Sequence, residues 1–188
     1  MPKIAVVYHS GYGPTKTQAE AVGEWAKMVA GTEVTLYSTE EASAKMDELH
    51  LADAIIFGAP TYMGSMSGPL KSFFDETCKF WTKQLWKDKL AAGFTSSSNP
   101  SGDKLNTING IFLLAMQHAM IWVGEGVLPG TKTADFGDVE LNHLGIWNGA
   151  GVQSVKGGPG LLDGAVETSK YLGKRVAEST ARWVKGRA

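Results

Sequence analysis

The chain has 188 residues, of which 43% are hydrophobic and 20% charged, and its formal net charge at pH 7 is -1. These values are typical of one globular domain with a substantial core, and they exclude a disordered chain. The near-neutral charge argues against partners such as nucleic acid or an anionic membrane surface. No run approaches the roughly 20 apolar residues of a membrane span, and we expect no signal peptide. Cys78 is the single cysteine, which excludes an internal disulfide and favours a cytoplasmic location.

Five short apolar runs alternate with helical patterns along the chain. In chain order we expect a strand at 3–8, a helix at 15–31, a strand at 32–38, a helix at 43–50, a strand at 53–59, a helix at 69–80, a strand at 89–96, a helix at 104–118, a strand at 119–125 and a helix at 163–185. This order predicts an α/β fold, in which a parallel sheet is covered by helices on both faces. Right-handed crossovers then give one doubly wound domain over residues 1–188.

The glycine-rich stretch 126–160 has no helical period. It is long for a connection without structure, so we expect it to contain a strand or a functional loop of its own.

The segment "HSGYGPT" (9–15) follows the first expected strand and leads into the first helix. Its small residues can present hydroxyls and unobstructed backbone N–H groups at a helix N-terminus, which binds phosphate without a lysine or arginine. Neither the Walker pattern nor the spaced-glycine dinucleotide fingerprint is present. The segment therefore predicts a site for a single phosphate ester, and the alternative is an ordinary glycine-bearing turn.

Two further loops follow the third and fourth strands, and ligands of open α/β sheets bind at such strand ends. "GAPTYMGSMSGP" (58–69) combines a rigid turn, an aromatic face and small residues, which suits a flat ring; its alternative is a surface turn with a helix cap at Ser67. "TSSSNPSGDK" (95–104) offers backbone donors to a ring edge, although its composition is also that of ordinary loops.

No residue pattern indicates acid–base, nucleophilic or metal chemistry. The four histidines lack metal-ligand spacing, and no nucleophile elbow of the GxSxG type occurs. Trp81 and Trp86 are expected in the core or at an interface, and Trp81 alternatively walls a ring-shaped ligand. We therefore assign no catalytic side chain and no metal.

With these loops, the chain resembles the flavodoxin-like superfamily and, within it, the WrbA-type NAD(P)H:quinone oxidoreductases and related FMN reductases. The resemblance covers most of residues 1–125 and rests on "VVYHSGYG", "AIIFGAPTYMGSMSGPLKSFFDET", "FWTKQLWKDKLAAGFTSS" and "AMQHAMIWV". It implies a three-layer sandwich with a five-stranded parallel sheet in the order 2-1-3-4-5, FMN as cofactor and NAD(P)H as cosubstrate. The implied function is a two-electron ping-pong hydride transfer from NAD(P)H through FMN to a quinone. The alternative is a flavodoxin-type electron carrier without substrate turnover, although such carriers are usually strongly acidic.

The resemblance also implies roles for individual residues and an assembly. The FMN phosphate would be bound by Ser10, Gly11, Tyr12, Gly13, Pro14 and Thr15; the ring would be lined by Pro60, Thr61, Tyr62, Met63, Gly64 and Ser65, and its polar edge covered by Ser96, Ser97, Ser98, Asn99 and Ser101. Tyr12 and Trp81 match substrate positions, and either Gln117 or His118 would contribute to the flavin site. Members of this family often form tetramers in which partners complete each flavin site, so we expect a homodimer or homotetramer.

Overall fold

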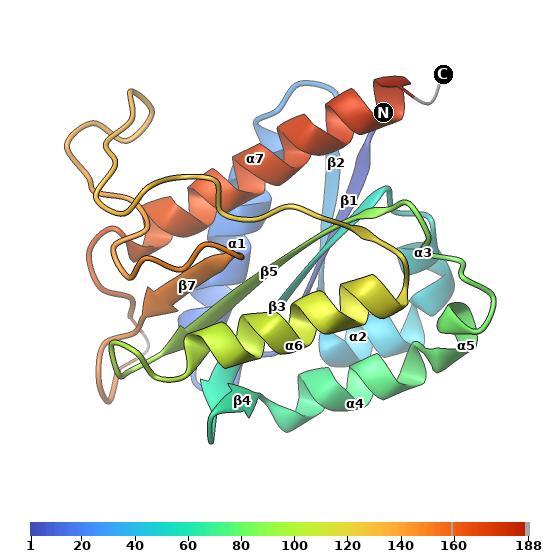
Figure 1. The fold of residues 1–188 in the computed structure, drawn as a ribbon, viewed down its shortest axis with the longest axis horizontal. Coiled ribbons are helices and arrows are strands. Elements are labelled where there is room, and N and C mark those ends of the chain that lie inside the picture. The colour runs from blue at the N-terminus through green and yellow to red at the C-terminus, as the bar shows by residue number, and fades with distance from the viewer. Residues whose placement is uncertain (159, 187–188) are drawn as a thin grey trace.

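The computed structural model of the protein describes residues 1–158 and 160–186. A sheet runs through the middle of the molecule, with helices on both of its faces (Figure 1). The strands are β1 (Lys3–Tyr8), β2 (Glu33–Ser38), β3 (Ala54–Tyr62), β4 (Ser65–Met66), β5 (Leu90–Ser97), β6 (Ile121–Trp122) and β7 (Ala150–Gln153). The helices are α1 (Pro14–Lys27), α2 (Thr39–Ala44), α3 (Met46–His50), α4 (Gly68–Glu76), α5 (Cys78–Trp81), α6 (Lys104–Gln117) and α7 (Ala165–Gly186).

The strand order confirms the predicted topology. The sheet runs β2-β1-β3-β5-β6 with parallel neighbours, which is 2-1-3-4-5 when the short β4 is left out. The fifth position of the sheet is shared by two segments. β6 pairs with the first residues of β5, and β7 pairs in parallel with its last four residues. The stretch 126–160 thus contains a strand, as predicted.

The predicted strand 119–125 is too long, because only Ile121 and Trp122 pair as strand residues. The chain then turns away from β5, and the N–H group of Glu125 donates to the carbonyl of Trp147 instead. We call residues 123–149, which connect β6 to β7, the insert.

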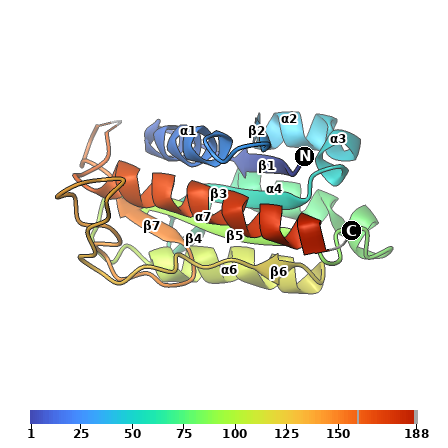
Figure 2. The same ribbon diagram turned by 90° about the horizontal axis from the view of Figure 1, so that it is seen from above.

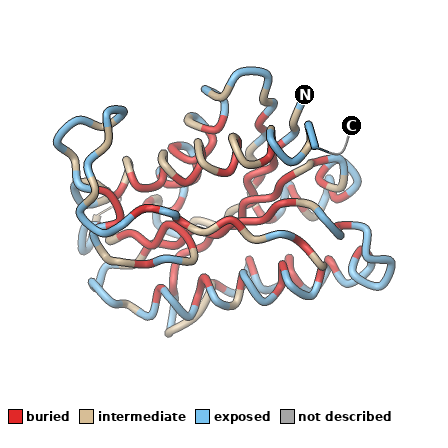
Figure 3. Tube along the Cα trace, turned by 45° about the horizontal axis from the view of Figure 1, so that its top comes forward, coloured by how far each residue is buried: buried red, intermediate tan, exposed pale blue. Residues whose placement is uncertain are grey.

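The core has two halves, one on each face of the sheet. α1 and α7 cover one face, and α2 to α6 cover the other (Figures 1 and 2). Along β1, Ile4 and Val6 belong to the first half, whereas Ala5 and Val7 belong to the second. Because both faces are covered, the central strands β1, β3 and β5 carry continuous apolar runs rather than alternating polarity. Figure 3 shows the resulting burial along the strands and the inward sides of the helices.

Two of the predicted helices are each divided in the structure. The predicted helix 69–80 is divided at Thr77, whose hydroxyl donates to the carbonyl of Phe74 over 2.7 Å. In place of 43–50 the chain forms α2 and α3, and α2 begins early because Ser38 and Glu41 form a reciprocal capping box. Among the described residues, no helix has the length and apolar character that crossing a membrane requires.

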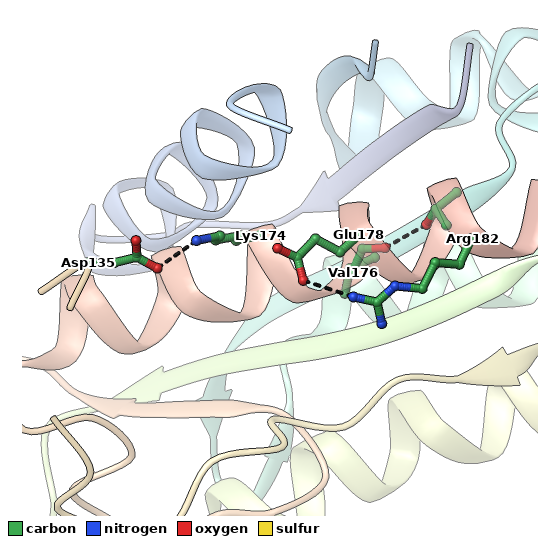
Figure 4. Close-up of polar contacts among 6 residues, drawn as sticks. Asp135, Lys174, Val176, Glu178 and Arg182 are labelled. Atoms are coloured by element: carbon green, nitrogen blue, oxygen red, sulfur yellow. Dashed lines mark hydrogen bonds and ion pairs between the residues drawn. The ribbon is translucent and has the colours of Figure 1, made fainter. Parts of the chain in front are cut away.

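The insert is attached to the layer formed by α1 and α7. Lys174 Nζ lies 2.6 Å from Asp135 Oδ2, an ion pair that Figure 4 shows beside the Glu178–Arg182 pair of α7. The ring of Phe136 stacks on that of Trp25 in α1, with centroids 4.4 Å apart. In Figures 1 and 2 the insert runs from β6 across the molecule, and its loops lie at the same end as β7. This is also the end at which the carboxyl end of β5 lies.

Candidate functional site

The loops that follow β1, β3, β5 and β7 meet at the carboxyl edge of the sheet and enclose a cavity of about 600 Å³. We call it the carboxyl-edge cavity. Its walls come from all three loops singled out in the sequence and from a fourth, and they comprise Tyr12, Pro14, Thr15, Pro60, Thr61, Tyr62, Ser96, Ser97, Ser98, Ser154, Val155, Gly157 and Gly158. The parallel order of the strands explains this convergence, because it places their carboxyl ends at one edge.

The loop after β1 is closed by its own serine. Ser10 Oγ accepts hydrogen bonds from the backbone N–H groups of Gly13 at 3.2 Å and Lys16 at 3.1 Å. Gly13 has a φ of 108°, a backbone conformation that residues with a Cβ atom rarely adopt. Pro14 then begins α1. Thr15 is buried, and its Oγ1 lies 2.9 Å from Ser96 Oγ on β5. The first loop is thus joined to the third at the base of the cavity.

This loop retains donors that suit a phosphate. Within the described chain, the N–H groups of Gly11, Tyr12 and Thr15 form no hydrogen bond with a protein acceptor. A Cβ atom at Gly11 would lie 2.6 Å from Tyr62 Oη, so the backbone approaches the second loop closely. Within residues 1–158 and 160–186, no lysine or arginine lines the cavity. A donor set of N–H and hydroxyl groups at the N-terminus of α1 fits a phosphate monoester, which is the charged end of FMN.

The loop after β3 presents apolar side chains at the mouth of the cavity. Met63 and Gly64 have positive φ values of 48° and 81°, which form the tight turn between β3 and β4 and leave Met63 fully exposed. The rings of Tyr12 and Tyr62 meet edge to face, with centroids 6.1 Å apart. Tyr12 is 81% exposed. Tyr12 and Tyr62 line the cavity and provide an aromatic surface for a flat ring, whereas Met63, Gly64 and Ser65 are not among its wall residues.

A buried network of threonines holds the second loop in place. Thr61 Oγ1 lies 2.8 Å from Thr95 Oγ1 and 2.7 Å from Thr107 Oγ1, and Thr95 donates to the carbonyl of Ala59. The side chain of Asn106 also donates to the carbonyl of Gly64 over 2.7 Å. Asn106 and Thr107 had not been singled out in the sequence, and Thr95 had been included only as the first residue of the third loop. Their partners lie on other elements, so no local pattern marks them.

The third loop and the loop after β7 form the remaining wall. Ser96, Ser97 and Ser98 line the cavity, whereas Asn99 and Ser101 lie in the exposed outer part of the loop. Gln153 Nε2 donates to the carbonyl of Ser98 over 2.9 Å and joins this loop to β7. Sequence reasoning missed the wall residues Ser154, Val155, Gly157 and Gly158. Their signal was the glycine-rich composition of the stretch 126–160, which predicted a functional loop without identifying residues.

Trp81, Gln117 and His118 lie elsewhere within the chain. They border a separate cavity of about 390 Å³ between α4, α5 and α6. α6 has 14 residues, or about 21 Å of length, and its C-terminal end returns to the amino ends of the strands. Within one chain these three residues therefore do not share a site with the loops.

His118 has a structural environment of its own. Its Nε2 lies 2.9 Å from Thr77 Oγ1, and its ring centroid lies 4.6 Å from that of Trp86. Burial lowers its pKa to about 4, so the imidazole is neutral at physiological pH. These contacts make His118 part of the core of its own chain.

Comparison with known proteins agrees with this geometry. Flavodoxin FldP of Pseudomonas aeruginosa is 38% identical over 183 residues, which cover 94% of this chain and 96% of that protein. An NAD(P)H dehydrogenase (quinone) of Aromatoleum aromaticum is 32% identical over 208 residues and covers 99% of both chains. The crystal structure of a flavodoxin, WrbA-like protein from Agrobacterium tumefaciens has a TM-score of 0.76 and 35% identity, covering 97% of this chain and 99% of that one.

The model of the NADPH-dependent FMN reductase family matches residues 13–131, a range that includes the last three residues of the first loop and the whole of the second and third. This match and the similar structure confirm the flavodoxin-like fold and the FMN cofactor that the sequence predicted. The chain belongs to the NADPH-dependent FMN reductase family.

Proposed function

We propose that the protein is an FMN-dependent NAD(P)H:quinone oxidoreductase. The observation that carries the proposal is the carboxyl-edge cavity, which joins a phosphate cradle without cations to an exposed aromatic mouth. Residues 10–15 would hold the phosphate of FMN, while Thr61, Tyr62 and Ser96 to Ser98 would face its ring. FMN supplies the hydride chemistry in such a site, which agrees with the lack of an acid–base pair among the lining residues.

The chain itself positions flat molecules and supplies neutral hydroxyl donors. Burial, and to a smaller extent the neighbouring Tyr12, raise the pKa of Tyr62, so its phenol is uncharged at physiological pH. The exposed ring of Tyr12 can cover one planar substrate at a time. A nicotinamide and a quinone would then occupy the same place in turn, which corresponds to a ping-pong cycle.

Two measurements on the purified protein test the proposal. FMN binding is followed by quenching of flavin fluorescence, and turnover by NADH or NADPH consumption with benzoquinone as acceptor. We expect reduction of bound FMN by at least one nicotinamide, and parallel lines in double-reciprocal plots. Bound flavin that light reduces but neither nicotinamide reduces would contradict the oxidoreductase function.

A flavodoxin-type electron carrier is the second candidate, and the 38% identity to a protein named flavodoxin favours it. The net charge of -1 counts against it, because carriers of this type use strong negative charge to approach basic partners. Electron transfer to a redox protein without turnover of benzoquinone would support this second function.

We extend the proposal to self-association as a homodimer or homotetramer in the cytoplasm. The outer face of α6 and the end of α5 expose large apolar side chains, among them Leu113 at 61%, Trp81 at 43% and Met116 at 38%. Such a face on a monomer favours burial against another protein surface. Light scattering after size-exclusion chromatography tests this, with a shift toward monomer expected for Leu113→Glu. A monomeric wild type would contradict the assembly.

A further inference from the structure

Lys104 occupies a place where its charge is unfavourable. It is the first residue of α6, where the helix dipole repels a cation, and its side chain is fully buried. Burial of an ammonium group costs free energy unless several acceptors surround it. Its position therefore requires a local cause.

That cause is the loop directly before it. Lys104 Nζ donates to the carbonyl of Asn99 at 2.6 Å and of Pro100 at 3.1 Å, with the carbonyl of Ser101 at 3.5 Å. The chain reverses through Gly102 and Asp103, which have φ values of 52° and 54°. We call residues 98–103 the lysine-centred loop, because their backbone folds around this ammonium group.

Gly102 shows how tightly the lysine-centred loop is closed. A Cβ atom there would lie 2.1 Å from Ser97 Oγ, 2.9 Å from the carbonyl of Asn99 and 3.2 Å from Lys104 Nζ. The cavity wall residues Ser97 and Ser98 lie directly next to these contacts. Fixing the carbonyls of residues 99–101 around the ammonium therefore also fixes the peptide groups beside the carboxyl-edge cavity.

Carbonyl dipoles alone compensate the charge of Lys104. Among the described residues no carboxylate forms an ion pair with it. Asp103 precedes it, but Asp103 Oδ2 lies beside Gly64, 4.0 Å from the place of a Cβ atom there. His143 of the insert faces the outer side of the loop across a cavity of about 980 Å³ that Ser101 and Asp103 also line. Burial lowers the pKa of Lys104 to about 8.

We propose that Lys104 is a positioning residue for FMN: its ammonium group holds the lysine-centred loop in the conformation in which Ser97 and Ser98 contact the flavin. Lys104 lies behind the loop and acts through it. The inference rests on FMN binding in the carboxyl-edge cavity and deepens that part of the proposed function.

The test compares the wild type with Lys104→Met, which keeps the length of the side chain but has no donor. At pH 7 we expect the Kd for FMN, measured by fluorescence quenching, to rise by about tenfold, the value of one charge-assisted hydrogen bond. Lys83→Met is the matched control, because Lys83 is exposed. It lines neither the carboxyl-edge cavity nor the cavity on the outer side of the lysine-centred loop. The control is expected to keep the wild-type Kd.

The pH dependence separates positioning from a general loss of stability. Raising the pH from 7 to 9 deprotonates Lys104 in the wild type, so its Kd is expected to rise several-fold, whereas the Kd of Lys104→Met stays nearly constant. Hydrogen exchange of the FMN-free proteins supplies a second readout. Exchange in Lys104→Met is expected to be faster at residues 98–103 and unchanged in β1 and β3, because Asn99, Pro100 and Ser101 are exposed and their carbonyls can turn to water.

Three results would overturn the inference. In the first, Lys104→Met binds FMN as tightly as the wild type. In the second, both proteins show the same change in Kd between pH 7 and 9. In the third, faster exchange extends to β1 and β3, which indicates a role in overall stability. Each of these results is obtained with a wild type that binds FMN, so it contradicts the role of Lys104 alone. A wild type that does not bind FMN would instead contradict the proposed function. The two failures are therefore distinguishable.

Discussion

Glu125, at the start of the insert, tests how the burial of a carboxyl group makes the stability of this fold depend on pH. Its side chain is fully buried, and both carboxyl oxygens lack a hydrogen-bond partner among the described residues. Burial raises its pKa to about 8, while the nearby Arg175 acts in the opposite direction. Arg175 Nε donates to the carbonyl of Gly124 over 3.0 Å. The carboxyl group of Glu125 is therefore protonated in the folded protein at neutral pH.

The cost of this burial follows from linkage between folding and protonation. In the unfolded chain Glu125 ionises near its ordinary pKa of 4.5, whereas the folded chain keeps the proton up to about pH 8. The stabilising contribution is thus fully present below pH 4.5 and is lost as the pH rises through 8. Each pH unit within this window lowers the free energy of unfolding by about 1.4 kcal/mol. Between pH 5 and 8 the loss amounts to roughly 3 kcal/mol.

Glu125→Gln removes the titration while keeping the shape of the side chain. Urea unfolding of both proteins at pH 5 and 8 gives the two free-energy differences. We expect the free energy of unfolding of the variant, relative to that of the wild type, to be roughly 3 kcal/mol higher at pH 8 than at pH 5. Lys104 and His118 titrate equally in both proteins, so their contributions cancel. If the advantage of the variant is the same at both pH values, Glu125 is not protonated in the folded chain and the reasoning fails.

Three further substitutions test the core, the cradle and the buried histidine. Gly58→Ala places a Cβ atom 2.0 Å from the ring of Phe94, so we expect a loss of about 2 kcal/mol in thermal unfolding. Gly11→Ala displaces Tyr62, whose Oη would lie 2.6 Å from the new atom, and the Kd for FMN is expected to rise about tenfold. The pKa of His118 is lowered to about 4, so its contribution to stability is lost as the pH falls from 6.5 through 4. His118→Gln is therefore expected to flatten this part of the urea-unfolding profile.

Gly68→Ala is the matched control for the glycine substitutions. Nothing lies within 4 Å of a Cβ atom at Gly68, and an alanine suits the first turn of α4. Stability and the Kd for FMN should both stay at wild-type values. A similar loss in Gly58→Ala and Gly68→Ala would show that close packing against Phe94 is not the cause, and an unchanged Kd in Gly11→Ala would remove the first loop from the FMN site.

The sheet was predictable because its central strands carry their own signal. β1, β3 and β5 are continuous apolar runs, and their alternation with helices implies the parallel order. The fifth strand was wrong in extent. The N–H group of Val123 still donates to the carbonyl of Ala91 in β5, but that of Glu125 donates to the carbonyl of Trp147, which lies more than twenty residues away in sequence. Local patterns contain no information on such a competition for a hydrogen bond.

In the candidate site, too, some features could be predicted from the sequence and others depend on contacts that only the fold creates. The three loops could be predicted because parallel strands place their carboxyl ends together, whatever the details of packing. Thr107 and Lys104 had not been assigned, since their roles depend on groups that the fold brings near them. Gln117 and His118 followed from resemblance alone, and Trp81 from resemblance and from its aromatic side chain. All three border a separate cavity of their own chain, at the far end of α6.

The division of the fifth strand has a consequence for how this protein tolerates change. β6 and β7 each keep their own register with β5, so the chain between Trp122 and Ala150 can lengthen or shorten without shifting either ladder. Doubling a loop adds only about 0.6 kcal/mol of closure entropy. The insert ends immediately before β7 and the wall residues Ser154 and Val155. Variation in its length can therefore reshape the wall that Ser154 and Val155 form, while the loop after β1, on the opposite side of β5, stays the same.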